Sequence, residues 1–359
     1  MRILHLTDRL SQRGGADLHL LELLGELAQG HTLHLCVAQD DGTAAAPCPV
    51  SRVGGLGSRG AEPCAAALDE VVRGFAPDLI HVHTIQNPSA LAWAAERGGV
   101  ATVQDHRPFC PGRGKLTASG GRCAVAMSDE ACGDCFSDVA YYRGVLTLTK
   151  ARLAALGRMR AITVLSSYMK RELIAVGIAA HRVHVVPPIV SDLGARRESP
   201  LPCGYVLVAG RLVAAKGLAD AVTAWRRSGL SNPLRFVGTG SRRGEIEAQG
   251  FEGTGWCDHA GMGDVLRGAA ALLFAPRWQE PLGIVGVEAL RLGVPVAAWQ
   301  SGGVCEWHPG PLGEWGDVDA LARRLAASIH EPVPLPTLLG RRPAMQRLEA
   351  IYAAATTAA

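Results

Sequence analysis

Short apolar runs alternate with amphipathic stretches along almost the whole chain, and this alternation limits the possible folds more than any other feature. Apolar runs bounded by turn residues are typical of strands that are buried on both faces. Strands that alternate with helices form parallel sheets, because a parallel crossover is long enough to hold a helix. The predicted strands lie at residues 3–7, 33–38, 79–83, 101–104, 162–165 and 183–186, and then at 205–209, 234–237, 271–274 and 294–298.

The alternation breaks once, at Pro187-Pro188 and the polar stretch after it. A chain of 359 residues is too long for one ordinary domain and fits two. We therefore predict an α/β protein with two Rossmann-like, doubly wound parallel-sheet domains that face a central cleft, at residues 1–190 and 203–335. A linker at 191–202 joins them, and a helical tail follows at 336–359. Ligands of such sheets bind at the carboxyl ends of the strands.

Composition limits the partners and the compartment. The net charge of +3 at pH 7 is too mild to indicate nucleic-acid binding, although it is compatible with an anionic substrate or with peripheral contact with a membrane. The first apolar run, interrupted by Asp8, is too short for a signal peptide, and no stretch approaches the roughly 18 apolar residues of a membrane span. We expect a cytoplasmic protein, with association at the cytoplasmic face of a membrane left open. Its ten cysteines are then expected to be thiols or metal ligands rather than disulfides.

The segment Glu280-Pro-Leu-Gly-Ile-Val-Gly-Val-Glu288 carries two carboxylates with a proline and a glycine between them. The proline and Gly283 disfavour a helix in the first half, whereas the residues from Ile284 onward can form one. Glu280 should therefore lie in a loop, and Glu288 in the first two turns of the next helix. Backbone N–H groups at the helix start, from Gly283 to Val285, would face an anion. Two carboxylates that bind hydroxyl groups beside an anion site suit a nucleoside diphosphate sugar.

Two other interpretations of these acids remain open at this point. They could be solvated side chains near an ordinary helix. They could also form the carboxylate pair of a glycosidase, in which the two groups are about 5 Å apart in retaining enzymes and further apart in inverting ones. Side chains on a loop and on the following helix can reach either distance.

Two cations follow the predicted strand at 205–209. Gly210-Arg211 ends this strand, and Lys216 comes directly before the next helix, whose N-terminus adds partial positive charge. Arginine can bind a diphosphate with two parallel hydrogen bonds, and lysine acts as a point charge. The alternative is two solvated surface cations, but their presence in the same half as the two acids favours a diphosphate site.

Two glycine turns also follow predicted strands. Gly14-Gly15 can bring the backbone close to a phosphate or an acceptor, but it lacks the G-x-G-x-x-G spacing of an ordinary dinucleotide site. Gly238-Thr239-Gly240 is expected to be a structural turn near the cleft.

Together these motifs resemble the retaining glycosyltransferases of family 4, which have the GT-B fold. The segment from Trp278 to Ala289 is close to the signature of the family, and Ser301-Gly302-Gly303 followed by Glu306 matches a nearby loop. The resemblance implies a hexosyltransferase that moves a sugar from a nucleoside diphosphate sugar to an acceptor hydroxyl. The implied reaction is a front-face substitution with retention of configuration, and no cofactor is required for the chemistry. The acceptor could be a glycan, a lipid-linked sugar or a small molecule.

The resemblance also implies roles for individual residues. The acid matching Glu288 holds the ribose of the nucleotide, and the acid matching Glu280 holds hydroxyl groups of the transferred sugar. The residues matching Arg211 and Lys216 neutralise the leaving diphosphate. The remaining donor-binding residues are backbone positions in glycine-rich turns and at a helix start: Gly14, Gly15, Gly210, Gly283, Ile284 and Val285.

One position departs from the family. A His-Asp pair often ends a strand of the first half, whereas this chain has Gln104-Asp105-His106. His106 could take over the catalytic contact, Gln104 could contribute only a hydrogen bond, and a purely structural histidine is also possible. His81 and His83 lie on the same face of a strand, because side chains alternate, and His83 is the better candidate for the cleft.

Four cysteines gather in a glycine-rich insertion at about residues 107–138. They are Cys110, Cys123, Cys132 and Cys135, and the last two form Cys-Gly-Asp-Cys. Four thiolates could hold a structural zinc ion that ties down a loop with little core of its own. The irregular spacing leaves unpaired thiols, or a redox or disulfide pair, as alternatives. The other six cysteines are expected to be scattered core residues.

Two further classes of function remain open beside the glycosyltransferase. A nucleotide-sugar epimerase or a phosphorylase could use a similar fold, but no lysine lies in a context that indicates bound pyridoxal phosphate. A non-catalytic sugar-nucleotide-binding protein is disfavoured because Arg211, Lys216, Glu280 and Glu288 are all present.

Overall fold

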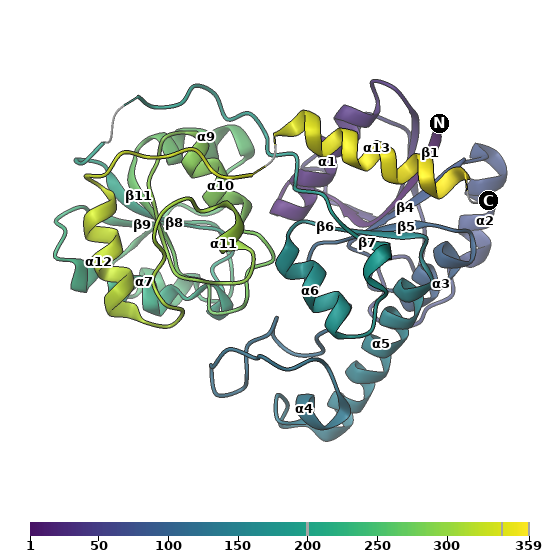
Figure 1. Ribbon diagram of the computed structural model, residues 1–359, viewed down its shortest axis with the longest axis horizontal. Coiled ribbons are helices and arrows are strands. Elements are labelled where there is room, and N and C mark those ends of the chain that lie inside the picture. The colour runs from purple at the N-terminus through teal and green to yellow at the C-terminus, as the bar shows by residue number, and fades with distance from the viewer. Residues whose placement is uncertain (199–200, 339, 358–359) are drawn as a thin grey trace. The chain divides into compact units, whose positions relative to one another are not determined.

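The computed structural model describes residues 1–198, 201–338 and 340–357, and its chain divides into two compact units (Figure 1). Unit 1 contains Met1–Ile189 and the C-terminal helix α13 (Arg341–Thr357), and unit 2 is Val190–Leu338. The division falls next to Pro187-Pro188. The expected linker at 191–202 and the expected tail at 336–359 lie partly outside the described residues.

Unit 1 has a seven-stranded parallel sheet in the order β3-β2-β1-β4-β5-β6-β7. Its strands are β1 (Arg2–Leu10), β2 (Thr32–Asp40), β3 (Val50–Arg52), β4 (Leu79–His83), β5 (Val100–Val103), β6 (Ala161–Val164) and β7 (Val183–Val185). Its other helices are α1 (Gly15–Leu27), α2 (Ala65–Phe75), α3 (Pro88–Glu96), α4 (Asp129–Gly133), α5 (Val139–Arg158) and α6 (Ser167–Ala175). The strand order reverses between β1 and β4, which is where a doubly wound sheet binds its ligands.

The core of unit 1 lies on both faces of this sheet. Side chains alternate along a strand, so Leu4 and Leu6 of β1 join one apolar cluster and Ile3 joins the other. The second cluster also contains the leucines of α1 and Tyr352 of α13, which is fully buried. The C-terminal helix is therefore part of the core of unit 1 rather than a separate tail.

Unit 2 has a five-stranded parallel sheet in the order β10-β9-β8-β11-β12. Its strands are β8 (Tyr205–Ala209), β9 (Leu234–Val237), β10 (Glu252–Gly253), β11 (Ala269–Phe274) and β12 (Val296–Ala298). Its helices are α7 (Leu218–Ser228), α8 (Arg243–Glu247), α9 (His259–Arg267), α10 (Ile284–Arg291), α11 (Val304–Trp307) and α12 (Val318–Ser328). Every residue of β11 is buried, because helices cover both faces of the sheet. The predicted fold, two doubly wound parallel sheets, is confirmed.

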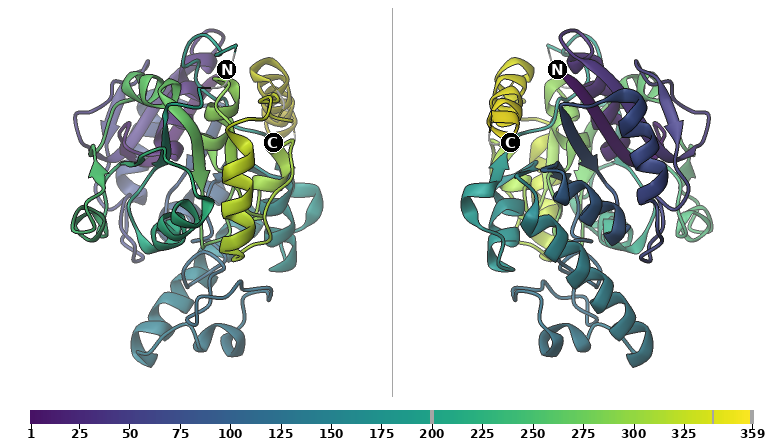
Figure 2. Two further views of the ribbon diagram at one scale, coloured as in Figure 1. Left: turned by 90° about the vertical axis from the view of Figure 1, so that its left-hand side faces the viewer. Right: turned by 90° about the vertical axis from the view of Figure 1, so that its right-hand side faces the viewer.

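The cysteine-rich insertion of unit 1 lies between β5 and the 20-residue helix α5. Figures 1 and 2 show the insertion, with α4 beside the first turns of α5, extending away from the sheet of unit 1. None of the helices in the described ranges is both long enough and apolar enough to cross a membrane.

Candidate functional site

Three loops of unit 2 meet at the carboxyl ends of β8, β11 and β12, which are neighbours in the sheet. The N–H groups of Arg277 and Trp278, in the loop after β11, donate to the carbonyl oxygen of Ala215 in the loop after β8, at 2.9 and 3.2 Å. The N–H of Gly303, after β12, donates to the carbonyl oxygen of Glu280 at 2.8 Å. These bonds hold the two predicted motifs next to each other.

Two glycines permit this close approach of backbones. A Cβ atom at Gly217, where φ is +66°, would lie 1.8 Å from the carbonyl oxygen of Ala275. A Cβ atom at Gly302, where φ is +51°, would lie 2.2 Å from the carbonyl oxygen of Glu280. Any side chain at either position would push the loops apart.

Glu280 lies in the loop before α10, as predicted, and hydrogen bonds hold both its side chain and its backbone. Its side chain is 8% exposed, and Oε2 accepts hydrogen bonds from Nζ of Lys216 at 2.8 Å and from Nε1 of Trp278 at 2.6 Å. Its backbone N–H donates to Oγ of Ser301 at 3.1 Å, and this hydroxyl donates to the carbonyl oxygen of Trp278 at 2.8 Å. A carboxylate held in this way presents its other oxygen, Oε1, in a defined place.

The indole ring of Trp278 brings the two predicted cations together. Nζ of Lys216 lies 4.8 Å from the ring centroid, and the guanidinium carbon of Arg211 lies 5.5 Å from it. Cations at such distances are attracted by the ring. Arg211 is exposed and Lys216 is half-buried, so the guanidinium is the more accessible of the two.

The start of α10 lies beside Glu280. Gly283 caps this helix with φ of +92°, and a Cβ atom there would lie 3.3 Å from Cγ of Glu280. The N–H groups of the first turn, including those of Ile284 and Val285, have no acceptor within the helix. Glu288 lies one turn later and is 7% exposed. The predicted loop-then-helix arrangement of the two acids is confirmed.

Two glycines at the other predicted positions support the loop after β8. Gly210 has φ of +127°, and its N–H donates to the carbonyl oxygen of Val237 at 2.9 Å. A Cβ atom at Gly238 would lie 1.9 Å from the carbonyl oxygen of Gly210. The turn at Gly238 is therefore structural, as expected, and it sets the path of the loop that carries Arg211.

In unit 1, Gly14 is the N-cap of α1, and Gly15 is its first residue. The carbonyl oxygen of Gly14 accepts a hydrogen bond from the N–H of Leu18 at 2.9 Å. Asp17 occupies the space next to Gly14, with Oδ2 3.1 Å from where a Cβ atom would lie, and it pairs with Arg9. The donor-binding role of both glycines remains a prediction.

Gln104 and His106 differ in whether their side chains have hydrogen-bond partners. His106 is 2% exposed, and its Nε2 is 3.0 Å from the hydroxyl oxygen of Tyr168. Gln104 is 8% exposed, yet within the described chain neither atom of its side-chain amide has a hydrogen-bond partner. Because a buried amide without partners costs about 1–3 kcal/mol, Gln104 is the residue with unused binding capacity.

Gln104 lines a pocket at the carboxyl ends of β4 and β5. Its other lining residues include charged and polar side chains, namely Thr84, Gln86, Asp105, Arg107 and Arg152. Thr84 has φ of +49°, a conformation that a β-branched residue rarely adopts and that often marks a functional site. None of the predicted motifs indicates this pocket, and the signal that could have found it is the polar sequence directly after β4.

Asp8, at the end of β1, belongs to the same edge of the sheet. Burial raises the pKa of its carboxyl to about 6, although Arg107 and a hydrogen bond with Gln86 lower it. In the described structure Oδ1 of Asp8 has no hydrogen-bond partner.

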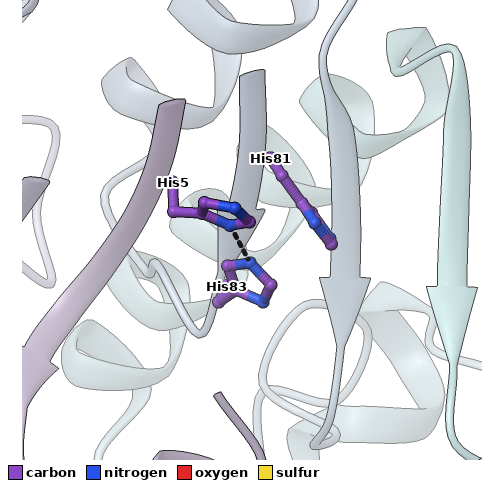
Figure 3. A group of neighbouring side chains, drawn as sticks. All are labelled: His5, His81 and His83. Carbon is purple, nitrogen blue, oxygen red and sulfur yellow. Dashed lines mark hydrogen bonds between the residues drawn. The ribbon is translucent and has the colours of Figure 1, made fainter. Parts of the chain in front are cut away.

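His5, His81 and His83 form a group in the core of unit 1 (Figure 3). Nδ1 of His5 is 3.1 Å from Nε2 of His83, and all three rings are at most 1% exposed. His81 uses both ring nitrogens, one 2.6 Å from the hydroxyl of Tyr352 and the other 2.7 Å from that of Thr102. His81 and His83 share a face as predicted, but that face is in the core, so His83 is not a cleft residue.

One potential ligand atom from each of these three histidines lies within 4.8 Å of the others. A metal ion there would bring a double positive charge into an apolar core without a carboxylate to balance it, which is costly. Both nitrogens of His81 are also engaged. We interpret the group as a hydrogen-bonding network that joins α13 to the sheet.

The ten cysteines all lie within the described residues, and none of them forms a disulfide there. Cys110, Cys123 and Cys135 are half-buried and Cys132 is buried. Of the other six, Cys36 and Cys64 are buried, whereas Cys203 and Cys305 are exposed, so the expectation that all six are core residues is wrong.

Comparisons with known proteins agree with the fold and with the family that the sequence resembles. The family model described as Glycosyltransferase Family 4 matches residues 13–192, and the one described as Glycosyl transferases group 1 matches residues 204–331. The 2-deoxystreptamine glucosyltransferase of Streptomyces kanamyceticus is 29% identical over 320 residues, which cover 79% of this chain and 77% of that protein. The 2-deoxystreptamine N-acetyl-D-glucosaminyltransferase of Streptomyces fradiae is 28% identical over 305 residues, covering 75% of this chain and 68% of that protein.

Solved structures share the fold at lower sequence identity. HepE of Anabaena in complex with UDP has a TM-score of 0.65 at 16% identity, over 99% of this chain and 100% of that chain. Sucrose-phosphate synthase of Thermosynechococcus elongatus has a TM-score of 0.70 at 16% identity, over 100% of this chain and 100% of that chain. The protein is therefore a glycosyltransferase with the GT-B fold, and the chain belongs to glycosyltransferase family 4.

Proposed function

We propose that the protein transfers a hexosyl group from a nucleoside diphosphate sugar to an acceptor hydroxyl, with retention of configuration and without a catalytic metal ion. The observation that carries the proposal is the meeting of Arg211, Lys216 and Glu280 around Trp278, beside the start of α10. Solved complexes of HepE with UDP and with UDP-glucose support a uridine diphosphate sugar as the first donor to test.

In this proposal the diphosphate binds at Arg211, Lys216 and the first-turn N–H groups of α10. Lys216 already pairs with Glu280, so Arg211 and the helix start supply most of the uncompensated positive charge. Negative charge grows on the leaving diphosphate as the bond to the sugar breaks. Fixed donors that stabilise this charge lower the barrier.

The carboxylates bind hydroxyl groups rather than acting as acid and nucleophile. Glu280 accepts hydrogen bonds from Lys216 and Trp278, so it does not serve as the proton donor that a glycosidase requires. It is placed to orient the transferred sugar through its other oxygen. Glu288, on α10, would bind the ribose.

We place the acceptor in unit 1, at the pocket lined by Gln104, Thr84 and Asp105. The unpartnered amide of Gln104 and carboxylate oxygen of Asp8 offer hydrogen bonds to hydroxyl groups. Two relatives are named for action on 2-deoxystreptamine, so an aminocyclitol is the first acceptor to test, followed by lipid-linked and polymeric glycans. We also propose a cytoplasmic location.

The test is a calorimetric screen of nucleoside diphosphates and their sugar conjugates, followed by turnover with candidate acceptors in the presence of a chelator. We expect binding of one nucleoside diphosphate, and transfer to a product whose anomeric configuration, measured by NMR, equals that of the donor. An inverted product would contradict retention, and loss of activity with the chelator would contradict metal-free chemistry. Conversion of the donor to an epimer without acceptor would favour the epimerase instead.

A further inference from the structure

Four cysteines of the insertion come from three separate stretches of chain. The N–H of Cys110 donates to the carbonyl oxygen of His106 at 2.7 Å in the turn after β5. The N–H of Cys123 donates to the carbonyl oxygen of Lys115 at 2.9 Å, in a short hairpin. Cys132 lies in α4, and Cys135 follows in a turn where its N–H donates to the carbonyl oxygen of Cys132 at 3.2 Å.

These stretches converge on Gly112. A Cβ atom at Gly112 would lie 3.9 Å from Sγ of Cys110 and 3.8 Å from Sγ of Cys135, so both sulfur atoms flank the same glycine. The hairpin that carries Cys123 reaches the same place, because the backbone of Ala118 hydrogen-bonds with the thiol of Cys135.

The insertion has little apolar core with which to hold this arrangement. Its own cluster consists of Cys132, Tyr142 and Leu146, with Met127 and Phe136 packed against it. Burial of three such side chains contributes roughly 1.5–3 kcal/mol each. Ordering the backbone costs about 1–2 kcal/mol per residue, and the insertion is about 30 residues long. It is attached to the rest of unit 1 through buried Phe109, through the 3.0 Å ion pair of Lys115 with Glu172, and through the 2.5 Å ion pair of Asp129 in α4 with Lys150 in α5.

We propose that Cys110, Cys123, Cys132 and Cys135 bind one zinc ion in a tetrahedral structural site that orders the insertion. Each thiol gives up its proton to the solvent on binding, so the site carries two net negative charges. Arg113 and Arg122 lie in the same insertion and can balance this charge.

The proposal includes a contraction of the loops. Zinc–sulfur bonds of about 2.3 Å place the four sulfur atoms roughly 3.8 Å apart. Among the described residues, no three of these sulfur atoms all lie within 4.8 Å of one another. Binding therefore has to draw the three stretches together, and this coupling of metal binding to local folding can be measured.

The first experiment measures metal in the full-length protein purified under reducing conditions. We expect about one zinc ion per chain, and a tetrahedral thiolate spectrum when cobalt(II) replaces zinc. Protein that contains no zinc as purified, and that takes up neither zinc nor cobalt when reduced, would overturn the proposal. Disulfides among these four cysteines in the metal-free native protein would also overturn it.

The second experiment compares two double variants. Cys132→Ser with Cys135→Ser should lose the zinc, and residues 107–138 should be cleaved by protease much faster, as in wild type treated with a chelator. The matched control is Cys203→Ser with Cys305→Ser, two exposed cysteines of unit 2, which should keep the zinc and the protection. Equal zinc content in the two variants would overturn the site. The zinc content and the cobalt(II) spectrum are measured on the wild-type protein. They therefore test the proposal even if a variant fails to fold.

Discussion

Nζ of Lys216 lies 2.8 Å from Oε2 of Glu280, and both groups are next to the indole of Trp278. The residue expected to neutralise the diphosphate is thus joined to the residue expected to bind the sugar. A change at either residue should therefore affect the other.

Glu280→Ala should abolish sugar transfer while nucleotide binding is largely kept, because the transferred sugar loses the group that orients it. We expect turnover to fall at least about 100-fold, a loss typical of misplaced substrates. The control is Glu314→Ala, an exposed acid of the same unit, which should leave turnover unchanged. Unchanged turnover of Glu280→Ala, measured with saturating donor, would remove Glu280 from the mechanism.

Arg211→Ala combined with Lys216→Ala should weaken the binding of a nucleoside diphosphate far more than that of the nucleoside. Each charge-assisted hydrogen bond is worth about 1.5–3 kcal/mol, which corresponds to at least about tenfold in affinity per residue. Calorimetry on both ligands makes the comparison. Arg226→Ala with Arg227→Ala, on the exposed face of α7, removes the same net charge and should change neither affinity. Equal losses for the two ligands would contradict diphosphate recognition.

Gly217→Ala should destabilise unit 2 by several kcal/mol, because its Cβ would meet the carbonyl oxygen of Ala275 at 1.8 Å. Gly229 has a similar φ, +71°, but open space around it. Gly229→Ala should therefore cost only about 1–2 kcal/mol, the price of the left-handed conformation alone. Urea unfolding of both variants measures the difference. Equal losses would show that the loops do not approach as described.

Acid should destabilise unit 1 through its buried histidines. Burial lowers the pKa of His5 to about 3 and that of His19 to about 4, and lowers those of His81 and His83 well below 6.5. The unfolded chain then binds more protons than the native protein below pH 6.5, so stability is fully present above that pH and falls with acidification. Each histidine lowers the free energy of unfolding by up to about 1.4 kcal/mol for each pH unit of acidification. Asp8, with its pKa raised to about 6, and Asp17, whose pKa burial also raises, act in the opposite direction, but these are two groups against the four histidines.

The matched variant for this prediction is His19→Leu. His19 is 6% exposed, and neither ring nitrogen has a partner among the described residues. Because an unpartnered buried donor costs free energy, His19→Leu should be neutral or stabilising at pH 7.5. Urea unfolding between pH 7.5 and 5 should also show a smaller loss of stability than in wild type. A wild-type stability that does not change over this range would contradict the burial of these rings.

Gln104→Ala and His106→Gln should separate the two candidate residues of unit 1. Gln104→Ala should raise the KM for the acceptor, because its amide has unused hydrogen-bonding capacity in the pocket. His106→Gln should lower the melting temperature and leave turnover within about threefold of wild type, since His106 is buried against Tyr168. A folded His106→Gln protein without activity would restore His106 to the catalytic residues.

Local patterns were sufficient to predict the fold and the loop and helix on which the two acids of unit 2 lie. Apolar runs identified most strands, and Pro281 and Gly283 placed Glu280 before α10. Arg211, Lys216 and Glu280 could be grouped because their motifs lie in the same half of the chain, and the structure shows that β8 and β11, which precede them, are neighbours in the sheet. The hydrogen-bond partners of these side chains could not be predicted, since the bond between Lys216 and Glu280 joins residues 64 positions apart.

Features that depend on tertiary packing could not be predicted from the sequence. The alternation of side chains places His83 on a face of its strand, but only the docking of α13 shows that this face is core. The choice between Gln104 and His106 rests on whether each side chain finds a partner, which sequence does not report. The helix α5 follows an insertion without clear periodicity, so its extent could not be anticipated.

The most direct test of the central claim is a crystal structure of the protein with a nucleoside diphosphate sugar bound. We predict that the diphosphate lies within hydrogen-bonding distance of Arg211 and of the first-turn N–H groups of α10, with a sugar hydroxyl on Glu280. A donor bound elsewhere, with its diphosphate out of reach of Arg211 and Lys216, would contradict the account.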